Sequence, residues 1–315
     1  MITWTIGAGG LLGSAVTRRS VRTFSGAPMT WGAGTADPDA WSSDVRAFRE
    51  AASDGPWGIV WAAGAATVSS SDADAAAELA TLNALLHALR SDPPGGSGAF
   101  FLTSSAGGVY AGSASPPFSE ATTPHPVSAY GELKVQQEAA ASEALAGTCP
   151  VVIGRISNLY GPGQNLGKLQ GLISRLAMAA ATQEPLNIFV PLDTIRDYIY
   201  VDDAAAMALH WTRAALAEQP EGPVVRIIAS GDSVTVGQLI RTMRVVTKRR
   251  IPIALGSHPS SASQALDLRL TPSGSGDLDA LPATPLPAGV KAVYLDILRR
   301  LQQVRPTGPA PHAPR

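Results

Sequence analysis

Apolar positions along the chain fall into two periods. Short apolar runs predict strands, and longer stretches with apolar residues every three or four positions predict helices. The chain begins with a predicted strand at 2–6, a glycine turn at 7–13 and a helix at 11–19. Further strands are expected at 59–62, 99–103, 151–156, 186–190, 198–201 and 224–229, and further helices at 42–53, 72–90, 129–145, 168–182, 202–218 and 236–247. This alternation predicts an α/β fold with a parallel sheet covered by helices.

Three segments depart from this rhythm. Residues 93–98 are rich in proline and glycine and are expected to form a surface connector. Residues 250–290 have weak periodicity and should form an irregular part of a smaller subdomain, together with 157–200. The last ten residues contain four prolines, so 305–315 is expected to be a disordered tail.

Composition removes several classes of protein. The chain carries 24 Lys and Arg against 25 Asp and Glu, a net charge of -1, which argues against nucleic-acid or anionic membrane partners. We expect no transmembrane span and no signal peptide, hence a cytoplasmic protein. A single cysteine excludes an internal disulfide and a cysteine-rich zinc site, and the five scattered histidines argue against a metal enzyme.

The glycines at 7, 10 and 13 follow a predicted strand and open a helix. In that context a glycine turn lets a pyrophosphate approach the N–H groups at a helix N-terminus. A purely structural turn is the alternative, because glycine is frequent throughout this chain. The following stretch, 28–34, offers no carboxylate for the adenosine ribose, which leaves the choice between NAD and NADP open.

Tyr130 and Lys134 lie four residues apart on one predicted helix, about 6 Å apart on the same face. A neighbouring ammonium favours the phenolate, which would let Tyr130 act as an acid or base near neutral pH. Ser105 follows the predicted strand at 99–103. It would therefore lie at the carboxyl edge, where α/β sheets bind ligands, and could form a hydrogen bond with a substrate oxygen. The alternative for Tyr130 and Lys134 is a pair of exposed helical side chains without a catalytic role. The alternative for Ser105 is a serine that only caps the end of the strand.

Taken together, these residues resemble the extended short-chain dehydrogenase/reductase family. Within it, the pattern is similar to nucleotide-sugar epimerases of the UDP-glucose 4-epimerase type. The resemblance covers roughly residues 1–250 and implies a Rossmann-type doubly wound parallel sheet with a smaller C-terminal substrate-binding subdomain. The motifs that carry it are Gly7–Gly13, Trp61–Gly64, Thr103–Tyr110, Tyr130–Lys134, Gly154–Gln164 and Arg196–Asp203.

The resemblance implies roles for individual residues. Ser105, Tyr130 and Lys134 correspond to the catalytic triad, with Tyr130 and Lys134 also touching the cofactor. The remaining cofactor contacts would be Gly7, Gly10, Gly13, Asp44, Gly64 and Asn83, and the remaining substrate contacts Asn158, Lys168 and Arg196. NAD is slightly favoured over NADP, and a homodimer is expected. The implied division is a dinucleotide-binding domain at 1–156, completed by about 197–230, and a substrate-binding subdomain at 157–196 plus 231–304.

The reaction itself stays open between two forms of hydride transfer. The residues after the strand-end serine are Ala106 and Gly107, where dehydratases of the family place an Asp-Glu pair, so dehydration is disfavoured. What remains is a nucleotide-sugar epimerase that works at a sugar hydroxyl carbon such as C4, or a reductase of nucleotide-linked keto-sugars. A dinucleotide-binding protein with weak catalysis is a further alternative.

Overall fold

The structure is a computed structural model, and it describes residues 1–27, 37–67, 70–167, 171–256, 265–273, 281 and 283–304. Within these residues six parallel strands form the main sheet, in the order β2-β1-β3-β4-β5-β9. Their bounds are β1 Ile2–Ile6, β2 Arg22–Phe24, β3 Trp57–Trp61, β4 Gly98–Ser105, β5 Val151–Ile156 and β9 Val224–Ile228. Because β2 and β3 flank β1 on opposite sides, the chain changes direction across the sheet between β1 and β3.

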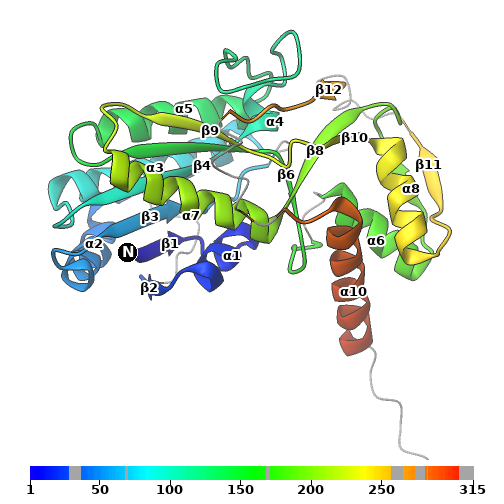
Figure 1. Cartoon of the computed structure of the whole chain (residues 1–315), viewed down its shortest axis with the longest axis horizontal. Helices are drawn as coiled ribbons and strands as arrows, with labels where there is room; N and C mark the ends of the chain where they lie inside the picture. Colours follow the sequence, from blue (N-terminus) through cyan, green and yellow to red (C-terminus); the bar gives the residue numbers. More distant parts are fainter. Residues whose placement is uncertain are drawn as a thin grey trace, which may run out of the picture.

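Helices cover both faces of this sheet, as the doubly wound fold requires (Figure 1). On one face lie α2 (Pro38–Ala52), α3 (Asp72–Ser91) and α5 (Ala129–Ala144). On the other face lie α1 (Leu11–Arg19) and α7 (Val201–Glu218). Strands buried on both faces read as continuous apolar runs, and β3 is such a run, with all five residues buried.

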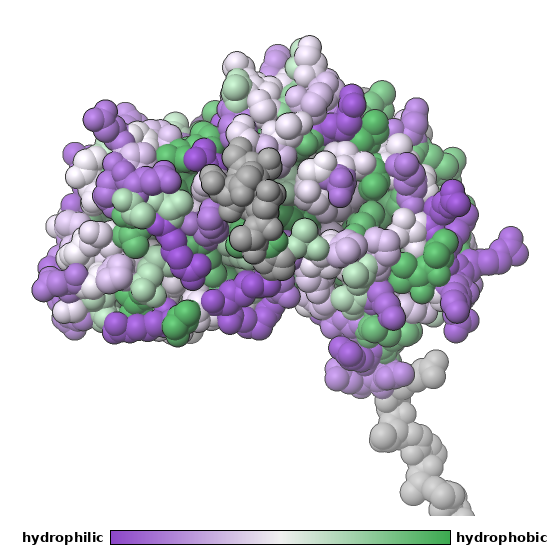
Figure 2. All heavy atoms as spheres, in the orientation of Figure 1, coloured by the Kyte–Doolittle hydropathy of each residue, from purple (hydrophilic) through white to green (hydrophobic). Residues whose placement is uncertain are grey.

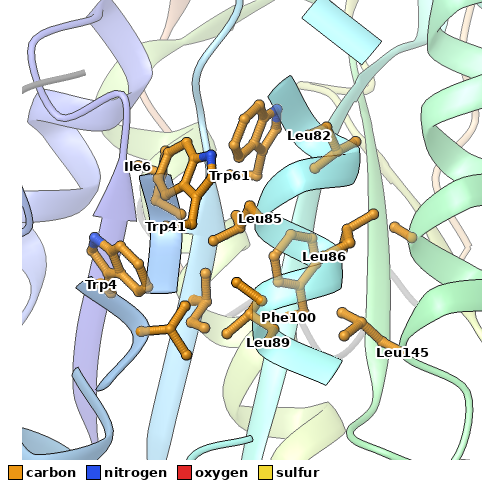
Figure 3. Packing of buried hydrophobic residues seen from close by; sticks show 14 of the residues in the cluster. Trp4, Ile6, Trp41, Trp61, Leu82, Leu85, Leu86, Leu89, Phe100 and Leu145 are labelled. Carbon is orange, nitrogen blue, oxygen red and sulfur yellow. The ribbon is translucent and has the colours of Figure 1, made fainter. Parts of the chain in front are cut away.

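Aromatic rings fill the core beneath α2 and α3. Figure 3 shows Trp4 of β1, Trp41 of α2 and Trp61 of β3 in one cluster with the leucines of α3. The ring centroids of Trp4 and Trp41 are 6.3 Å apart, as are those of Trp41 and Trp61. These side chains hold α2 and α3 against the strands whose carboxyl ends form the site.

The helix starts follow from local sequence. Ser71 and Asp74 form a capping box at the start of α3, and Thr235 and Gln238 do so for α8 (Val236–Thr247). In contrast, the N-cap of α1 is Gly10, and no side chain caps this helix. Its first N–H groups are therefore left for another partner.

A second lobe forms beyond β5. It contains a small sheet of β10-β8-β12 with β6 paired to β8, a two-stranded β7-β11 sheet, and three helices that share one apolar core. Figure 1 shows α6, α8 and α10 grouped at one end of the molecule, beyond β6 and β8. The bounds are β6 Asn158–Tyr160, α6 Leu172–Thr182, β7 Leu186–Ile188, β8 Ile195–Tyr200, β10 Ser233–Thr235, β11 Ile253–Leu255, β12 Asp267–Leu268 and α10 Leu286–Val304.

Most predicted elements are confirmed within a few residues, and the α/β class is confirmed. The prediction of an irregular segment up to 290 is wrong at its end, because α10 begins at Leu286 and packs Val290, Val293 and Ile297 into the second core. The sequence analysis also missed β2, the short α4 (Ala106–Val109), β6, β10, β11 and β12. All of these are four residues or shorter, too short for a period to show. The predicted tail lies outside the described residues.

Candidate active site

A cleft of about 1380 Å³ lies along the carboxyl edge of the main sheet and continues between the two lobes. Ligand pockets are commonly 300–1,000 Å³, so this cleft has room for more than one small ligand. Eight of the predicted site residues line it: Gly7, Gly10, Asp44, Gly64, Ser105, Tyr130, Asn158 and Arg196. Its walls come from both lobes, so a ligand in the cleft would touch both.

The glycine turn forms one wall of the cleft. Gly7 has a φ of +88°, a left-handed conformation that glycine adopts without strain. Its carbonyl accepts a hydrogen bond from the Gly10 N–H at 2.9 Å, which closes the turn. A Cβ on Gly13 would lie 2.1 Å from the Gly7 oxygen, so a glycine here allows α1 to approach the turn. Gly13 is thus buried behind the turn and does not line the cleft.

Two further glycines bring Ser105 and Tyr130 to the same wall. Ser105 caps α4, where its Oγ accepts from the Gly108 N–H at 3.1 Å, and its hydroxyl proton has no acceptor among the residues that the structure describes. A Cβ on Gly108 would lie 3.1 Å from the ring of Tyr130, and one on Gly131 would lie 2.4 Å from the Gly108 oxygen. The absence of both Cβ atoms lets α4 and α5 touch, with Tyr130 against Gly108.

Lys134 forms a buried ion pair with Glu78, which the sequence analysis did not predict. The Tyr130 ring centroid and Lys134 Nζ are 5.4 Å apart, so the expected neighbourhood on α5 is present. Lys134 itself is buried and does not line the cleft. Its Nζ donates to Glu78 Oε1 on α3 at 2.9 Å and to Gln137 Oε1 at 2.8 Å. The sequence analysis missed Glu78, although it stands on the apolar face of α3 with Leu82 and Leu85, an unusual place for a carboxylate.

Asn158 and Arg196 lie on β6 and β8, on the side of the cleft formed by the second lobe. Asn158 Nδ2 donates to the Asp197 carbonyl at 2.8 Å, which fixes its amide. Arg196 is 9% exposed, and its nearest acceptor is the Ile195 carbonyl at 2.8 Å. Burial lowers the pKa of Arg196, and the charge of Asp267 offsets this in part. No carboxylate within the described ranges forms an ion pair with it.

The alternative partners for Arg196 are occupied elsewhere. Asp202 pairs with Arg18 at 3.0 Å, and Asp203 accepts two hydrogen bonds from Thr284. Arg196 is therefore not a structural partner of either aspartate. Burying a guanidinium without a carboxylate partner costs free energy unless an anion binds it. The wall formed by β6 and β8 is therefore a candidate anion site.

Arg175 on α6 is a cleft residue that the sequence analysis missed. It is half-buried, and in the part of the chain that the structure describes it has no ion pair. Nothing in its local sequence distinguishes it from a solvent-facing helical arginine. Only the packing of α6 against α8 and α10 turns it toward the cleft.

Three predicted assignments need correction or fall outside the described residues. Asn83 lies on the exposed side of α3 and does not line the cleft, because the helix directs Leu82, Leu85 and Leu86 inward. We therefore drop its cofactor contact. Lys168 and the stretch 28–34 are outside the described residues.

Asp44 brings a carboxylate from α2 to the end of the cleft beside β2. Both of its oxygens accept from the Ala27 N–H, at 3.2 and 3.0 Å, just after β2. A Cβ on Gly26 would lie 2.9 Å from Asp44 Oδ2, so a glycine at 26 admits the carboxylate.

A sequence profile described as the NAD dependent epimerase/dehydratase family matches residues 6–227. The chain belongs to this family. A dTDP-L-rhamnose 4-epimerase of Burkholderia thailandensis is 30% identical over 128 residues, which cover 40% of this chain and 34% of that protein. A dTDP-4-dehydro-6-deoxyglucose reductase of Escherichia coli is 28% identical over 170 residues, covering 52% of each chain. The matched regions therefore span about a third and about half of these relatives.

The fold of the family extends over almost the whole chain. A UDP-glucose 4-epimerase from Thermotoga maritima, solved with UDP-glucose, superposes with a TM-score of 0.77 at 20% identity, covering 96% of this chain and 100% of that one. This likeness includes the second lobe, whose later elements, from β10 to α10, lie beyond the residues matched by the family profile. At this identity it establishes the fold of both lobes.

The residues of the cleft fit the dinucleotide of an NAD-dependent family. The turn Gly7–Gly10 leads into an uncapped helix N-terminus, and a Cβ on Gly9 would meet nothing within 4 Å. That combination of open space and free N–H donors suits a pyrophosphate.

Among the described residues, no helix is long and apolar enough to cross a membrane.

Proposed function

We propose that this protein is an NAD(P)-dependent nucleotide-sugar epimerase that acts at a sugar hydroxyl carbon, C4 in the first instance. The observation that carries the proposal is that Tyr130 and Ser105 line the same cleft as the glycine turn of one lobe and Arg196 of the other. The glycine turn would hold the pyrophosphate of the dinucleotide, and Arg196 with Asn158 the diphosphate of the sugar nucleotide. Arg175 is proposed as a further contact of that second diphosphate.

The residues of the chain have distinct roles in this proposal. When bound, the nicotinamide cofactor supplies the acceptor and donor of hydride. Tyr130 removes the proton from the sugar hydroxyl at its phenolic oxygen and returns it after the sugar has turned. Ser105 donates a hydrogen bond from its free hydroxyl proton to the same sugar oxygen. Lys134 and Asp44 are proposed as cofactor contacts, at the nicotinamide and adenosine ends respectively.

Reduction of a nucleotide-linked keto-sugar is the second candidate. The Escherichia coli relative carries a reductase name, and reduction needs the same Ser105 and Tyr130. An epimerase must keep its cofactor bound while the keto-sugar turns, whereas a reductase exchanges cofactor in each cycle. Dehydration stays disfavoured, because Ala106 and Gly107 offer no acid or base beside Ser105.

One assay distinguishes these activities. The purified protein is incubated with UDP- and dTDP-hexoses and catalytic NAD, and in parallel with 4-keto-sugar nucleotides and stoichiometric NADH or NADPH. Products are separated by anion exchange and identified by NMR. An epimerase gives a mixture of C4 epimers without net change in cofactor. A reductase gives no epimers but consumes stoichiometric NADH or NADPH with a 4-keto-sugar nucleotide. Neither product with any sugar nucleotide would contradict both proposals and favour a binding protein with weak catalysis.

The cofactor and the assembly are tested on the same preparation. Asp44 would accept hydrogen bonds from the adenosine ribose hydroxyls and repel a 2′-phosphate, so we propose NAD as the preferred dinucleotide. Calorimetric titration with NAD and NADP measures this preference directly. The expected homodimer is checked by light scattering coupled to gel filtration.

A further inference from the structure

Glu78 on α3 occupies the centre of a buried polar cluster behind Tyr130. Its side chain is 1% exposed in solvent-accessible area. Oε1 accepts from Lys134 Nζ at 2.9 Å and from Gln137 Nε2 at 3.0 Å. Oε2 accepts from the N–H groups of Ala65 at 2.9 Å and Ala66 at 2.8 Å. These four bonds fill the acceptor capacity of a carboxylate.

The cluster joins two parts of the cleft wall. Ala65 and Ala66 follow Gly64, which lines the cleft after β3, and Lys134 lies one helical turn beyond Tyr130, which lines it from α5. Glu78 binds both at once, so it fixes the spacing between the loop after β3 and the start of α5. Lys134 has three N–H donors and gives two to Glu78 and Gln137. In the described part of the chain the third has no acceptor.

We propose that Glu78 is a positioning residue of the reaction: it holds Lys134 in an ion pair behind Tyr130, so that Tyr130 acts beside a neutral pair instead of a lone ammonium. The inference rests on the proposed function for its catalytic consequence, but its electrostatic part concerns the protein alone. A lone ammonium stabilises a nearby phenolate, whereas an ammonium paired with a carboxylate produces a much smaller field.

Glu78 is ionised in the folded protein. Burial would raise the pKa of this carboxyl, but the charge of Lys134 and the hydrogen bonds from Ala66, Lys134 and Gln137 together lower it below its ordinary value. The carboxylate is therefore charged at neutral pH, where it balances the charge of Lys134.

Other charged groups packed around α5 do not replace Glu78. From β5, Arg155 is bound to Glu138 and to the hydroxyl of Tyr110, and α4 and β4 contribute no titratable side chain. On α5 itself, Glu132 is exposed. The other titratable groups of α3 are exposed at its two ends: Asp72, Asp74, His87 and Arg90.

The first test replaces Glu78 by the neutral isostere in Glu78→Gln and measures the pH at which the phenol of Tyr130 ionises in the cofactor-free protein. Absorbance difference against Tyr130→Phe isolates this one group. The separation is helped because burial raises the pKa of four of the six tyrosines: Tyr110, Tyr160, Tyr198 and Tyr200.

Glu78→Gln should lower the ionisation midpoint of Tyr130 by about one pH unit, because the ammonium is then unpaired. The acid limb of the kcat/KM profile should move by the same amount. Affinity for NAD should fall about tenfold, because the loop at 65–66 loses a charged acceptor. Glu132→Gln is the matched control, since it removes an exposed carboxylate two residues from Tyr130, and it should leave the midpoint and the affinity in place.

A midpoint unchanged in Glu78→Gln would overturn the inference, whatever the activity. If that variant does not fold, Glu78→Gln/Lys134→Met removes both charges, a replacement that buried pairs often tolerate. Its midpoint should stay within about half a unit of the parent protein, because a neutral pair is exchanged for a neutral pair. A rise of a full unit or more would mean that Lys134 acts alone and would also overturn the inference. Absence of turnover in the parent protein contradicts only the proposed function.

Discussion

Tyr130 is the residue on which the proposed chemistry depends most directly. Its hydroxyl has no hydrogen-bond partner among the described residues, while its ring packs on Gly108 and near Lys134. Removing the hydroxyl leaves these ring contacts intact. Tyr130→Phe should therefore lower kcat by about 10² to 10⁴ through loss of proton transfer.

The same variant should keep its thermal midpoint and its affinity for NAD. Calorimetric titration and a melting curve measure both on the sample used for kinetics. Near-normal kcat in Tyr130→Phe would contradict the assignment of Tyr130 as acid and base. A loss of folding instead would show that the hydroxyl has a structural partner in solution.

Arg196 is buried and forms no ion pair with any carboxylate of the described residues. A bidentate arginine–phosphate contact contributes about 1.5–3 kcal/mol, so Arg196→Ala should raise KM for the nucleotide sugar about 10- to 100-fold. The affinity for NAD should stay within a factor of about two. Because the buried guanidinium forms no ion pair with a described carboxylate, its removal should not lower thermal stability.

Arg269→Ala is the control for Arg196. Arg269 belongs to the same lobe but is half exposed and pairs with Asp267. An exposed pair contributes little, so this variant should change neither KM nor the melting temperature measurably. A stability loss in Arg196→Ala with an unchanged KM would contradict the substrate role.

The glycine turn and α1 act as a single element. The Cβ of Gly13→Ala would lie 2.1 Å from the Gly7 oxygen, and neither backbone segment can yield without opening the turn. We expect a loss of about 2 kcal/mol or more in the free energy of unfolding, together with weaker NAD binding. Chemical denaturation and calorimetric titration measure the two effects.

Gly9→Ala is the matched control within the same turn. A Cβ on Gly9 would meet nothing within 4 Å, so the free protein should unfold with nearly unchanged free energy. If the pyrophosphate lies in that open space, the added methyl should still weaken NAD binding. Equal stability losses in the two variants would show that the turn is not closed as described.

At the scale of the whole molecule, the two lobes that line the cleft are packed around separate hydrophobic cores. Ile297 of α10 is 1% exposed and belongs to the core of the second lobe. In that core α10 packs against α6, the helix that carries Arg175. Ile297→Ala should cost about 2–5 kcal/mol of stability through the cavity it leaves. Loosening this lobe should raise KM for the sugar nucleotide more than the dissociation constant of NAD.

Leu295→Ala gives the comparison for that change. Leu295 is on the same helix and 40% exposed, so its truncation should cost well under half as much. Figure 2 shows hydrophilic and hydrophobic residues interspersed over this face of the molecule. Unfolding followed by tryptophan fluorescence and activity together would reveal whether the second lobe opens first.

The sequence alone determined the features that depend on local spacing. The glycine turn, the Tyr130–Lys134 spacing and the alternation of strands and helices follow from neighbouring residues, whose geometry the backbone fixes. For this reason the sheet and most helix ends were predicted to within a few residues. Very short strands carried too little local pattern to be predicted. The helix α10 does have apolar residues at helical spacing, at Val290, Val293 and Ile297, but the proline and glycine at its start led to the expectation of an irregular segment.

Only the tertiary structure decided which residues from distant elements meet. Glu78 and Lys134 are 56 positions apart, and Asp44 reaches the end of β2 from α2. Asn83 was misplaced because one residue along a helix turns a side chain by about 100°, enough to exchange a buried face for an exposed one. Burial and pairing arise from packing between elements, and that packing left Arg196 without a carboxylate and Lys134 with one.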